Sequence, residues 1–375
     1  MGRVRWSRTP RADVAILSRN LELWPVLRQV VAGYSTYELE TIGTPINMRD
    51  AFSIARHLVA DKATVGYSAM AAQLRRADVK VLLAVDQTSQ AIEELGRLLP
   101  HLSQVIVAHG SIRADGLQLH HVRRREKRIL CVWGESDVDV YRKNIPNPVD
   151  CRIVGSLRNA GFLQAPRVEI RASVQHPLLF VSQYAGADEE DTSNTSSRVR
   201  VLRMLKHYVH RFCQERNLPL QIALRPPVSA PSHPLQTADE IRHYQQVFDG
   251  VTLGFSDPSQ PYSSYVASDL SDVTIGVPTG LLTESFARGN KVLMLQEQPE
   301  SDGYYKFPIA GPWLLTEPRY EEFASRLDLL RSQKRENLAG AWQRQREYMV
   351  ANATADRAIG LVRQFLDCAI RGETL

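Results

Sequence analysis

Ser271–Leu295 reads SDVTIGVPTGLLTESFARGNKVLML and predicts a strand, a tight turn, a helix and a second strand. Val273–Val277 is a short apolar run that the Pro-Thr-Gly sequence at 278–280 ends. Apolar residues at helical spacing follow as far as Gly289, which can close a helix in a left-handed conformation. Val292–Leu295 is a second buried strand. We therefore expect a β-turn-α-β unit within these twenty-five residues.

The start of the helix in this unit is a candidate phosphate site. The first N–H groups of a helix have no partner inside it, and its positive end attracts anions. Thr279, Gly280 and Thr283 can supply N–H and hydroxyl donors, and the carboxylate of Glu284 can accept from ribose or sugar hydroxyls. The alternative is an ordinary βαβ unit in which Thr279 only caps its helix.

Composition indicates a soluble protein of two or three domains. The chain has 375 residues, 43% of them hydrophobic and 23% charged, and a formal net charge of +5. Such a small basic excess does not indicate nucleic-acid binding. The four cysteines show no metal-ligand spacing and are expected to be reduced, which favours a cytoplasmic protein. We find no signal peptide and no apolar run long enough for a membrane span, so any membrane contact would be peripheral.

Strand and helix signals alternate along most of the chain, which predicts parallel sheets covered on both faces. We expect residues 1–170 and 171–355 to form two Rossmann-like doubly wound domains that face a cleft, and 356–375 to form a helix that returns to the first domain. Predicted strands are Asp13–Leu17, Tyr37–Ile42, Ala63–Gly66, Val79–Val85, Val105–Ala108, Leu178–Ser182, Leu220–Leu224 and Val251–Phe255. The segments Ile129–Trp133 and Cys151–Val154 depart from this alternation and are given no assignment. Predicted helices are Trp24–Ala32, Met48–Ala60, Ala69–Arg76, Ser89–Leu98, Val199–Phe212, Ala238–Phe248 and Ser263–Leu270, with a mostly helical tail from Arg319.

Several motifs resemble GT-B glycosyltransferases of bacterial surface-carbohydrate (capsule and lipopolysaccharide) biosynthesis. They are SYVASDLSDVTIGVPTGLLTESFARGNKVLML, YYKFPIAGPWLLTEPRYEEFASRLDLL, HGSIRADG and CVWGESDVDVYRKN with CRIVGSLRN. Together they are similar to segments of transferases that use CMP-Kdo. The Ser-Thr pair of that group is Pro278-Thr279 here. The resemblance implies an α/β GT-B fold and a nucleotide-sugar donor, with CMP-Kdo favoured.

Glycosyl transfer needs donors for the leaving phosphate, a base for the acceptor hydroxyl and support for a positively charged sugar. His109 follows a strand and is the candidate base or acceptor contact, with a structural histidine as the alternative. Arg225 can clamp phosphate, and Ser182 and Gln183 lie where the donor would meet the second sheet, although each also suits an ordinary surface position. Asp188 can face the sugar centre, unless its acidic loop is only a solvated surface.

Three classes of function stay open. The first is transfer from a nucleotide sugar to a surface polysaccharide or its lipid-linked precursor. The second is a sugar-nucleotide epimerase of the same architecture, and the third is a catalytically silent carbohydrate- or nucleotide-binding scaffold. We expect no cofactor and no metal, because Asp137-Val138-Asp139 matches a metal-binding DxD only by its letters. Further partners left open are peripheral membrane contact, a homo-oligomer and a biosynthetic complex.

Overall fold

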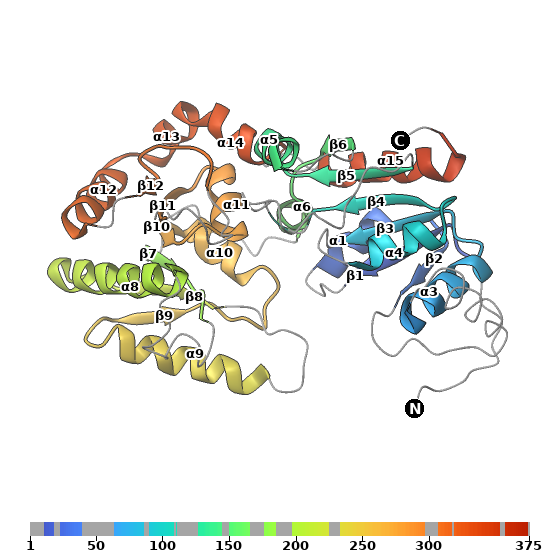
Figure 1. Cartoon of the computed structure of the whole chain (residues 1–375). Coiled ribbons are helices and arrows are strands. Elements are labelled where there is room, and N and C mark those ends of the chain that lie inside the picture. Colours follow the sequence, from blue (N-terminus) through green and yellow to red (C-terminus); the bar gives the residue numbers. More distant parts are fainter. Residues whose placement is uncertain are drawn as a thin grey trace. The chain divides into compact units, whose positions relative to one another are not determined.

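The chain forms two compact units, each built on one parallel sheet of six strands (Figure 1). The computed structural model describes residues 11–18, 23–39, 64–85, 90–108, 110, 127–144, 150–165, 176–184, 197–224, 233–296, 307–316, 319–352 and 357–373. The first unit is Met1–Gly161 with Ala355–Leu375, and the second is Phe162–Thr354. The predicted α/β class with two Rossmann-like doubly wound domains is confirmed.

The first sheet has the order β2-β1-β3-β4-β5-β6, and every neighbouring pair is parallel. Its strands are β1 (Val14–Ser18), β2 (Thr36–Glu38), β3 (Val81–Val85), β4 (Ser103–Val107), β5 (Arg128–Val132) and β6 (Asp150–Ile153). The chain adds β2 on one side of β1 and the other strands on the opposite side. The direction of strand addition therefore reverses between β1 and β3.

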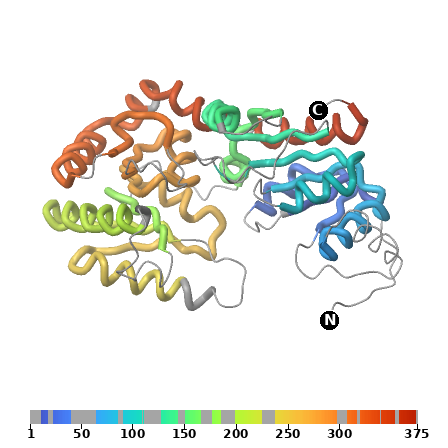
Figure 2. The backbone as a smooth tube through the Cα atoms, viewed as in Figure 1, coloured from blue at the N-terminus to red at the C-terminus, as the bar shows by residue number. Residues whose placement is uncertain are grey.

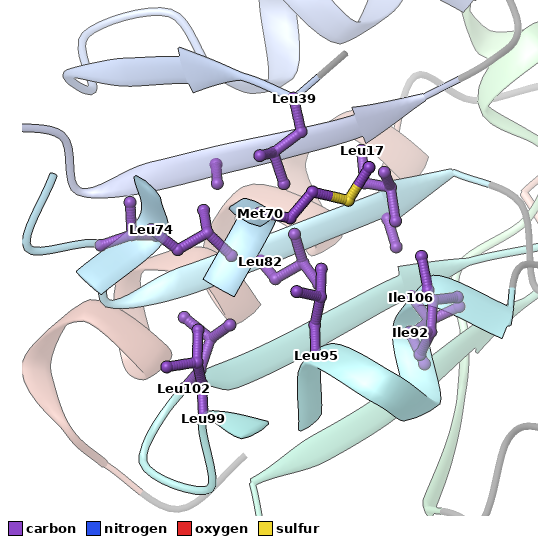
Figure 3. Packing of buried hydrophobic residues seen from close by; sticks show 14 of the residues in the cluster. Leu17, Leu39, Met70, Leu74, Leu82, Ile92, Leu95, Leu99, Leu102 and Ile106 are labelled. Atoms are coloured by element: carbon purple, nitrogen blue, oxygen red, sulfur yellow. The ribbon is translucent and has the colours of Figure 1, made fainter. Parts of the chain in front are cut away.

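Two apolar clusters cover the two faces of this sheet. Successive residues of β3 alternate between them, with Leu82 in one cluster and Leu83 in the other. In Figure 3, Met70 and Leu74 of α3 and Leu95 of α4 point onto the strands. The helices of the first unit are α1 (Trp24–Val30), α3 (Val65–Arg76), α4 (Gln90–Leu98), α5 (Glu135–Asn144), α6 (Leu157–Gln164), which continues into the second unit, and α15 (Arg357–Arg371).

The C-terminal helix α15 packs on the first unit. Figure 2 shows it in red beside the blue and teal parts of the chain, and it contacts α1, β3 and β4. Its buried stripe Ile359, Val362, Leu366 and Ala369 belongs to the second apolar cluster. Tyr34 closes the contact, because its hydroxyl donates to a carboxylate oxygen of Asp367 at 2.6 Å.

Three helical segments of the first unit differ from the sequence predictions or lie outside the described residues. The strand predicted at Ala63–Gly66 is wrong, because α3 begins at Val65 and its buried run from Ser68 to Leu74 has helical periodicity. Helix α5 was not predicted from the sequence. The helix predicted at Met48–Ala60 lies outside the described residues.

The second sheet has the order β12-β11-β10-β7-β8-β9 and is also parallel throughout. Its strands are β7 (His176–Val181), β8 (Leu220–Ala223), β9 (Leu253–Phe255), β10 (Ser271–Gly276), β11 (Lys291–Leu295) and β12 (Leu314–Leu315), of which β12 was not predicted. The chain adds β8 and β9 on one side of β7 and then returns to the other side with β10. The reversal therefore lies between β7 and β10.

Helices accompany this second sheet as its strand-helix alternation requires. They are α8 (Ser197–Arg216), α9 (His233–Val247), α10 (Ser263–Leu270), α11 (Gly280–Arg288), α12 (Tyr320–Ser332), α13 (Arg335–Ala341) and α14 (Gln343–Met349). α10 and α11 contact each other, whereas α8 contacts α9 and α12 (Figure 1). The two helices α10 and α11 start at the carboxyl edge of the sheet, since each follows a parallel strand.

Candidate functional site

The candidate site lies at the carboxyl edge of the second sheet, where β7 and β10 end side by side. In open parallel sheets, ligands bind beyond the carboxyl ends of the strands at the point where strand order reverses. Here the segment from Ser182 to Tyr184 follows β7, and the turn from Val277 to Thr279 follows β10. The structure thus brings Ser182, Gln183, Thr279 and Gly280, predicted from distant parts of the chain, to one edge.

Close packing places the start of α11 against the sheet. A Cβ atom added to Gly276 would lie only 2.8 Å from Cδ1 of Leu282 and 3.3 Å from Cβ of Val181. A glycine at the last position of β10 therefore lets Leu282 fill the space beside β7. At the other end of α11, Gly289 adopts φ 101°, so the predicted left-handed closure is confirmed.

Thr279 caps α11, as the alternative interpretation of this unit expected. Its Oγ1 accepts from the N–H of Leu282 at 3.3 Å, and its carbonyl accepts from the N–H of Thr283 at 3.0 Å. The N–H groups of Gly280 and Leu281 precede these first helical bonds. Capping does not exclude anion binding, because these two N–H groups and the positive helix end stay at the sheet edge.

Two of the predicted site residues in α11 have side chains turned into the protein. Thr283 and Glu284 are both fully buried. The Thr283 hydroxyl donates to the Thr279 carbonyl at 2.9 Å, and the Glu284 carboxylate accepts from the Tyr265 hydroxyl of α10. A ligand hydroxyl would have to share the Glu284 carboxylate with Tyr265.

A polar cluster holds the end of β7, and we call its six residues the strand-end cluster: the buried Ser182, Tyr184, Lys206, Glu240 and Tyr244 and the partly exposed His243. The Ser182 hydroxyl donates to Glu240, accepts from the Tyr244 hydroxyl at 2.8 Å and accepts from the Tyr184 N–H at 3.2 Å. Gln183 between these anchored neighbours is partly exposed. Ser182 is thus a structural anchor through its side chain, and Gln183 is the residue presented at the edge.

Sequence reasoning missed the contributions of α8 and α9 to this cluster. Nζ of Lys206 lies 2.8 Å from Nε2 of His243, and the His243 ring lies 4.8 Å from the ring of Tyr184. Lys206 and Glu240 are 4% and 2% exposed, so two charged groups are buried here. A lysine on the apolar face of α8, four residues after Leu202, was the available signal.

Three predicted residues, His109, Asp188 and Arg225, lie outside the described residues. The chain just before His109 is well held, since Nε1 of Trp133 donates to the Ala108 carbonyl at 3.2 Å. The Trp133 N–H in turn donates to the buried Asp137 carboxylate at 3.0 Å. Asp137 therefore serves the start of α5.

The described residues include few groups of the kind that bind metals or react as thiolates. Among those residues, no group of three or more His, Cys, Asp or Glu side chains is placed to hold a metal ion. All four cysteines are free, as predicted. Burial raises the pKa of Cys151 to about 12 and raises the pKa of Cys131 further, so these thiols stay protonated. No helix within the described ranges has the length and apolar character for crossing a membrane.

Solved structures share this architecture over almost the whole chain. α,α-Trehalose 6-phosphate synthase from Burkholderia multivorans is 11% identical with a TM-score of 0.54, covering 96% of this chain and 97% of its own. A UDP-GlcNAc 2-epimerase from Methanocaldococcus jannaschii, in complex with UDP-GlcNAc and UDP, is 11% identical with a TM-score of 0.52, covering 86% and 93%.

The chain has the GT-B fold. Sucrose-phosphate synthase from Thermosynechococcus elongatus also matches, at 11% identity and a TM-score of 0.50, over 96% of this chain and 97% of the other. Identities this low show the fold and not the activity. No protein-family model matches the sequence, and no curated protein sequence does. The resemblance to CMP-Kdo transferases therefore stays a prediction, while the GT-B fold that it implied is confirmed.

Proposed function

We propose that this protein is a glycosyltransferase that moves a sugar from a nucleotide-sugar donor to a surface polysaccharide or its lipid-linked precursor at the cytoplasmic side of the membrane. One observation carries the proposal: the anion-attracting start of α11 lies at the strand-order reversal between β7 and β10. The GT-B fold supports it, since structures of that fold include trehalose 6-phosphate synthase and sucrose-phosphate synthase.

The chemistry proposed for α11 is stabilisation of the departing phosphate. The N–H groups of Gly280 and Leu281 point toward the sheet edge ahead of the helix, and helix dipoles need no rearrangement as charge develops. The hydroxyl of Thr279 accepts from Leu282 and retains its own proton for donation. This arrangement needs no metal ion, so we propose that donor binding is metal-independent.

Other residues complete the proposal. Gln183 contacts the donor from the end of β7, and Glu284, positioned by Tyr265, accepts from a hydroxyl of the ribose or sugar. Arg225 clamps the phosphates, His109 removes the acceptor proton, and Asp188 faces the sugar centre. These last three roles rest on the strand-end positions of the sequence.

The nucleotide has two candidates. The sequence resemblance favours CMP, whereas a structure with the same fold is a complex with UDP-GlcNAc and UDP. Calorimetry with CMP, CDP, UDP and GDP sugars separates them, and we expect one base to be preferred over the others by at least about tenfold, or about 1.4 kcal/mol.

The epimerase alternative is favoured by one observation, the similarity to UDP-GlcNAc 2-epimerases. An epimerase would change the configuration of the bound sugar without an acceptor. A transferase instead releases nucleotide in proportion to added acceptor. A silent scaffold would bind a nucleotide sugar and do neither, so product analysis with and without acceptor distinguishes all three.

The phosphate site is tested by Gly280→Val with calorimetry in EDTA. The added side chain should obstruct the approach of phosphate to the helix start and weaken nucleotide binding by about 2 kcal/mol, or roughly thirtyfold. Gly360→Val in α15 is the control, because a Cβ there meets nothing within 4 Å. Unchanged affinity in Gly280→Val, or binding that needs added magnesium or manganese, would place the phosphate elsewhere.

A further inference from the structure

The strand-end cluster anchors both neighbours of Gln183. Ser182 is held through its hydroxyl by Glu240 and Tyr244, and Tyr184 is held through its ring by His243. Tyr184 is only 5% exposed, whereas Gln183 is partly exposed. Any change at His243 therefore alters the support of the chain on one side of Gln183.

The contact between His243 and Lys206 requires a neutral imidazole. At 2.8 Å, Nε2 must accept a hydrogen bond from the Lys206 ammonium. A lysine holds its proton far more strongly than a histidine does, so the shared proton belongs to Lys206. Protonation of His243 would leave two positively charged donors at hydrogen-bond distance with no acceptor between them, and the contact would break.

The remaining charges around His243 are few among the described residues. Lys206 of α8 faces Nε2, and Tyr184 covers the ring from the end of β7. On α9, the Glu240 carboxylate lies one turn away and accepts from Ser182, and Tyr244 packs edge-on against the imidazole. Asp239 and Arg242 pair with each other at the surface at 3.2 Å. Direct contact makes the Lys206 ammonium a strong charge at the ring, because Coulomb energy falls with distance.

We propose that neutral His243 is a positioning residue that holds Gln183 at the nucleotide site, so that donor affinity falls when His243 gains a proton. The inference rests on the proposed function, because it concerns the same sheet edge. The Lys206 ammonium opposes a second positive charge on the ring, so the contact is kept while His243 is neutral and is lost as pH falls and the ring gains a proton. His243 touches no substrate in this scheme and acts through Tyr184 and Gln183.

The test follows the affinity of the full chain for CMP and UDP by calorimetry between about pH 4.5 and 8, together with NMR titration of the His243 ring. We expect the ring to gain its proton over the same pH interval in which affinity falls. Affinity should fall by up to about tenfold per pH unit below the midpoint of that titration. His243→Gln keeps an acceptor for Lys206 and does not titrate, so its affinity should lack this fall.

Lys206→Met provides the second arm. Without the ammonium, the pKa of His243 and the midpoint of the affinity profile should both move upward by the same amount. His207→Gln, on the exposed side of α8, is the matched control and should keep the parent profile. A loss of the ring contact with Tyr184 can lower the affinity of His243→Gln by the same factor at every pH. A purely structural role for His243 therefore predicts that the affinity of the parent does not follow the titration of the ring.

The outcomes separate this inference from the proposed function. If the parent binds CMP or UDP and His243→Gln keeps the pH dependence, or Lys206→Met leaves the midpoint in place, the positioning role is overturned. If the parent binds neither nucleotide at any pH, the proposed function fails. The NMR arm then still decides whether Lys206 holds His243 neutral.

Discussion

The two sheets have six described strands each, yet buried carboxylates pair with side-chain hydroxyls at the carboxyl edge of the second sheet, whereas the buried Asp137 at that edge of the first accepts from a backbone N–H. In the first sheet, the buried Arg128 sits at the amino edge, where its guanidinium donates to Gln104 at 2.6 Å and to Glu93 at 2.8 Å. In the second sheet, Ser182 with Glu240 lies at the carboxyl edge, and Tyr265 with Glu284 joins the helices that start there. Two described polar pairs of the second sheet thus lie beside its candidate site, whereas Lys291 with Asp272 and Arg288 with Asp269 pair at its amino edge.

This difference has a physical consequence for the site. A buried polar group is costly unless it is hydrogen-bonded, so a paired group tolerates few geometries. Apolar contacts on the faces of the first sheet permit small shifts, whereas Tyr265 and Glu284 fix α10 relative to α11. Polar pairing at the start of α11 therefore specifies the position of the proposed phosphate donors.

The largest effect is expected for Arg128→Met, which tests the polar pair of the first sheet. Removing one partner of a buried ion pair costs about 3–5 kcal/mol, and the lower end applies because Glu93 is 22% exposed. Urea denaturation measures the loss. Arg97→Met, on the helix α4 that carries Glu93, is the control, because the Arg97–Glu94 pair is 37% and 24% exposed and should contribute less than about 1 kcal/mol. Equal losses in the two variants would show that burial of Arg128 has no energetic weight.

A smaller effect is expected for Tyr265→Phe, which tests the polar pair beside the candidate site. Loss of the hydroxyl removes a donor from the buried Glu284 carboxylate and should cost about 1–3 kcal/mol by urea denaturation. Tyr265→Phe combined with Glu284→Gln should recover part of that loss, because the buried charge is gone. A double variant as unstable as the sum of the single variants would show that the two side chains act independently.

The smallest effect is expected at the partly buried pair of Tyr34 and Asp367, which joins α15 to the chain after α1. It extends the comparison from buried polar pairs to one that solvent reaches. Burial and the hydrogen bond to Asp367 raise the pKa of Tyr34 to about 12 from about 10. A raised pKa stabilises the fold below about pH 10, and that stabilisation is lost as pH rises through about 12. Over this interval, the free energy of unfolding should fall more for the parent than for Tyr34→Phe, as measured by urea denaturation. The same alkaline loss in both proteins would contradict the role of Tyr34.

Strong local patterns allowed much of the fold to be predicted. Ser263–Leu270 was predicted to the residue, and the Thr279 cap and Gly289 closure of α11 followed from capping chemistry. Short segments were less secure: Ala63–Gly66 was assigned to a strand because four residues cannot show a period, and the two-residue β12 has no pattern at all.

The candidate site likewise has residues that local patterns predicted and residues that they did not. Thr279, Gly280 and Gln183 were found because each follows a predicted strand, and parallel strands end at one edge. Lys206 and His243 could not be found, since they lie on different helices and their 2.8 Å contact depends on how α8 packs against α9. The burial of Thr283 and Glu284 in α11 was also hidden, because helical spacing does not reveal which polar groups meet α10.

The sequence by itself determined the α/β class, the alternation of strands and helices, and the turn that opens α11. These properties follow from residue type and from spacing along a few turns of chain. Only the tertiary structure decided that strand order reverses between β7 and β10, that Glu284 is buried against Tyr265, and that His243 receives a bond from Lys206. The physical reason is that these contacts join residues distant in the sequence: Tyr265 and Glu284 are 19 positions apart, and Lys206 and His243 are 37 apart. Packing selects such partners, and local propensity does not.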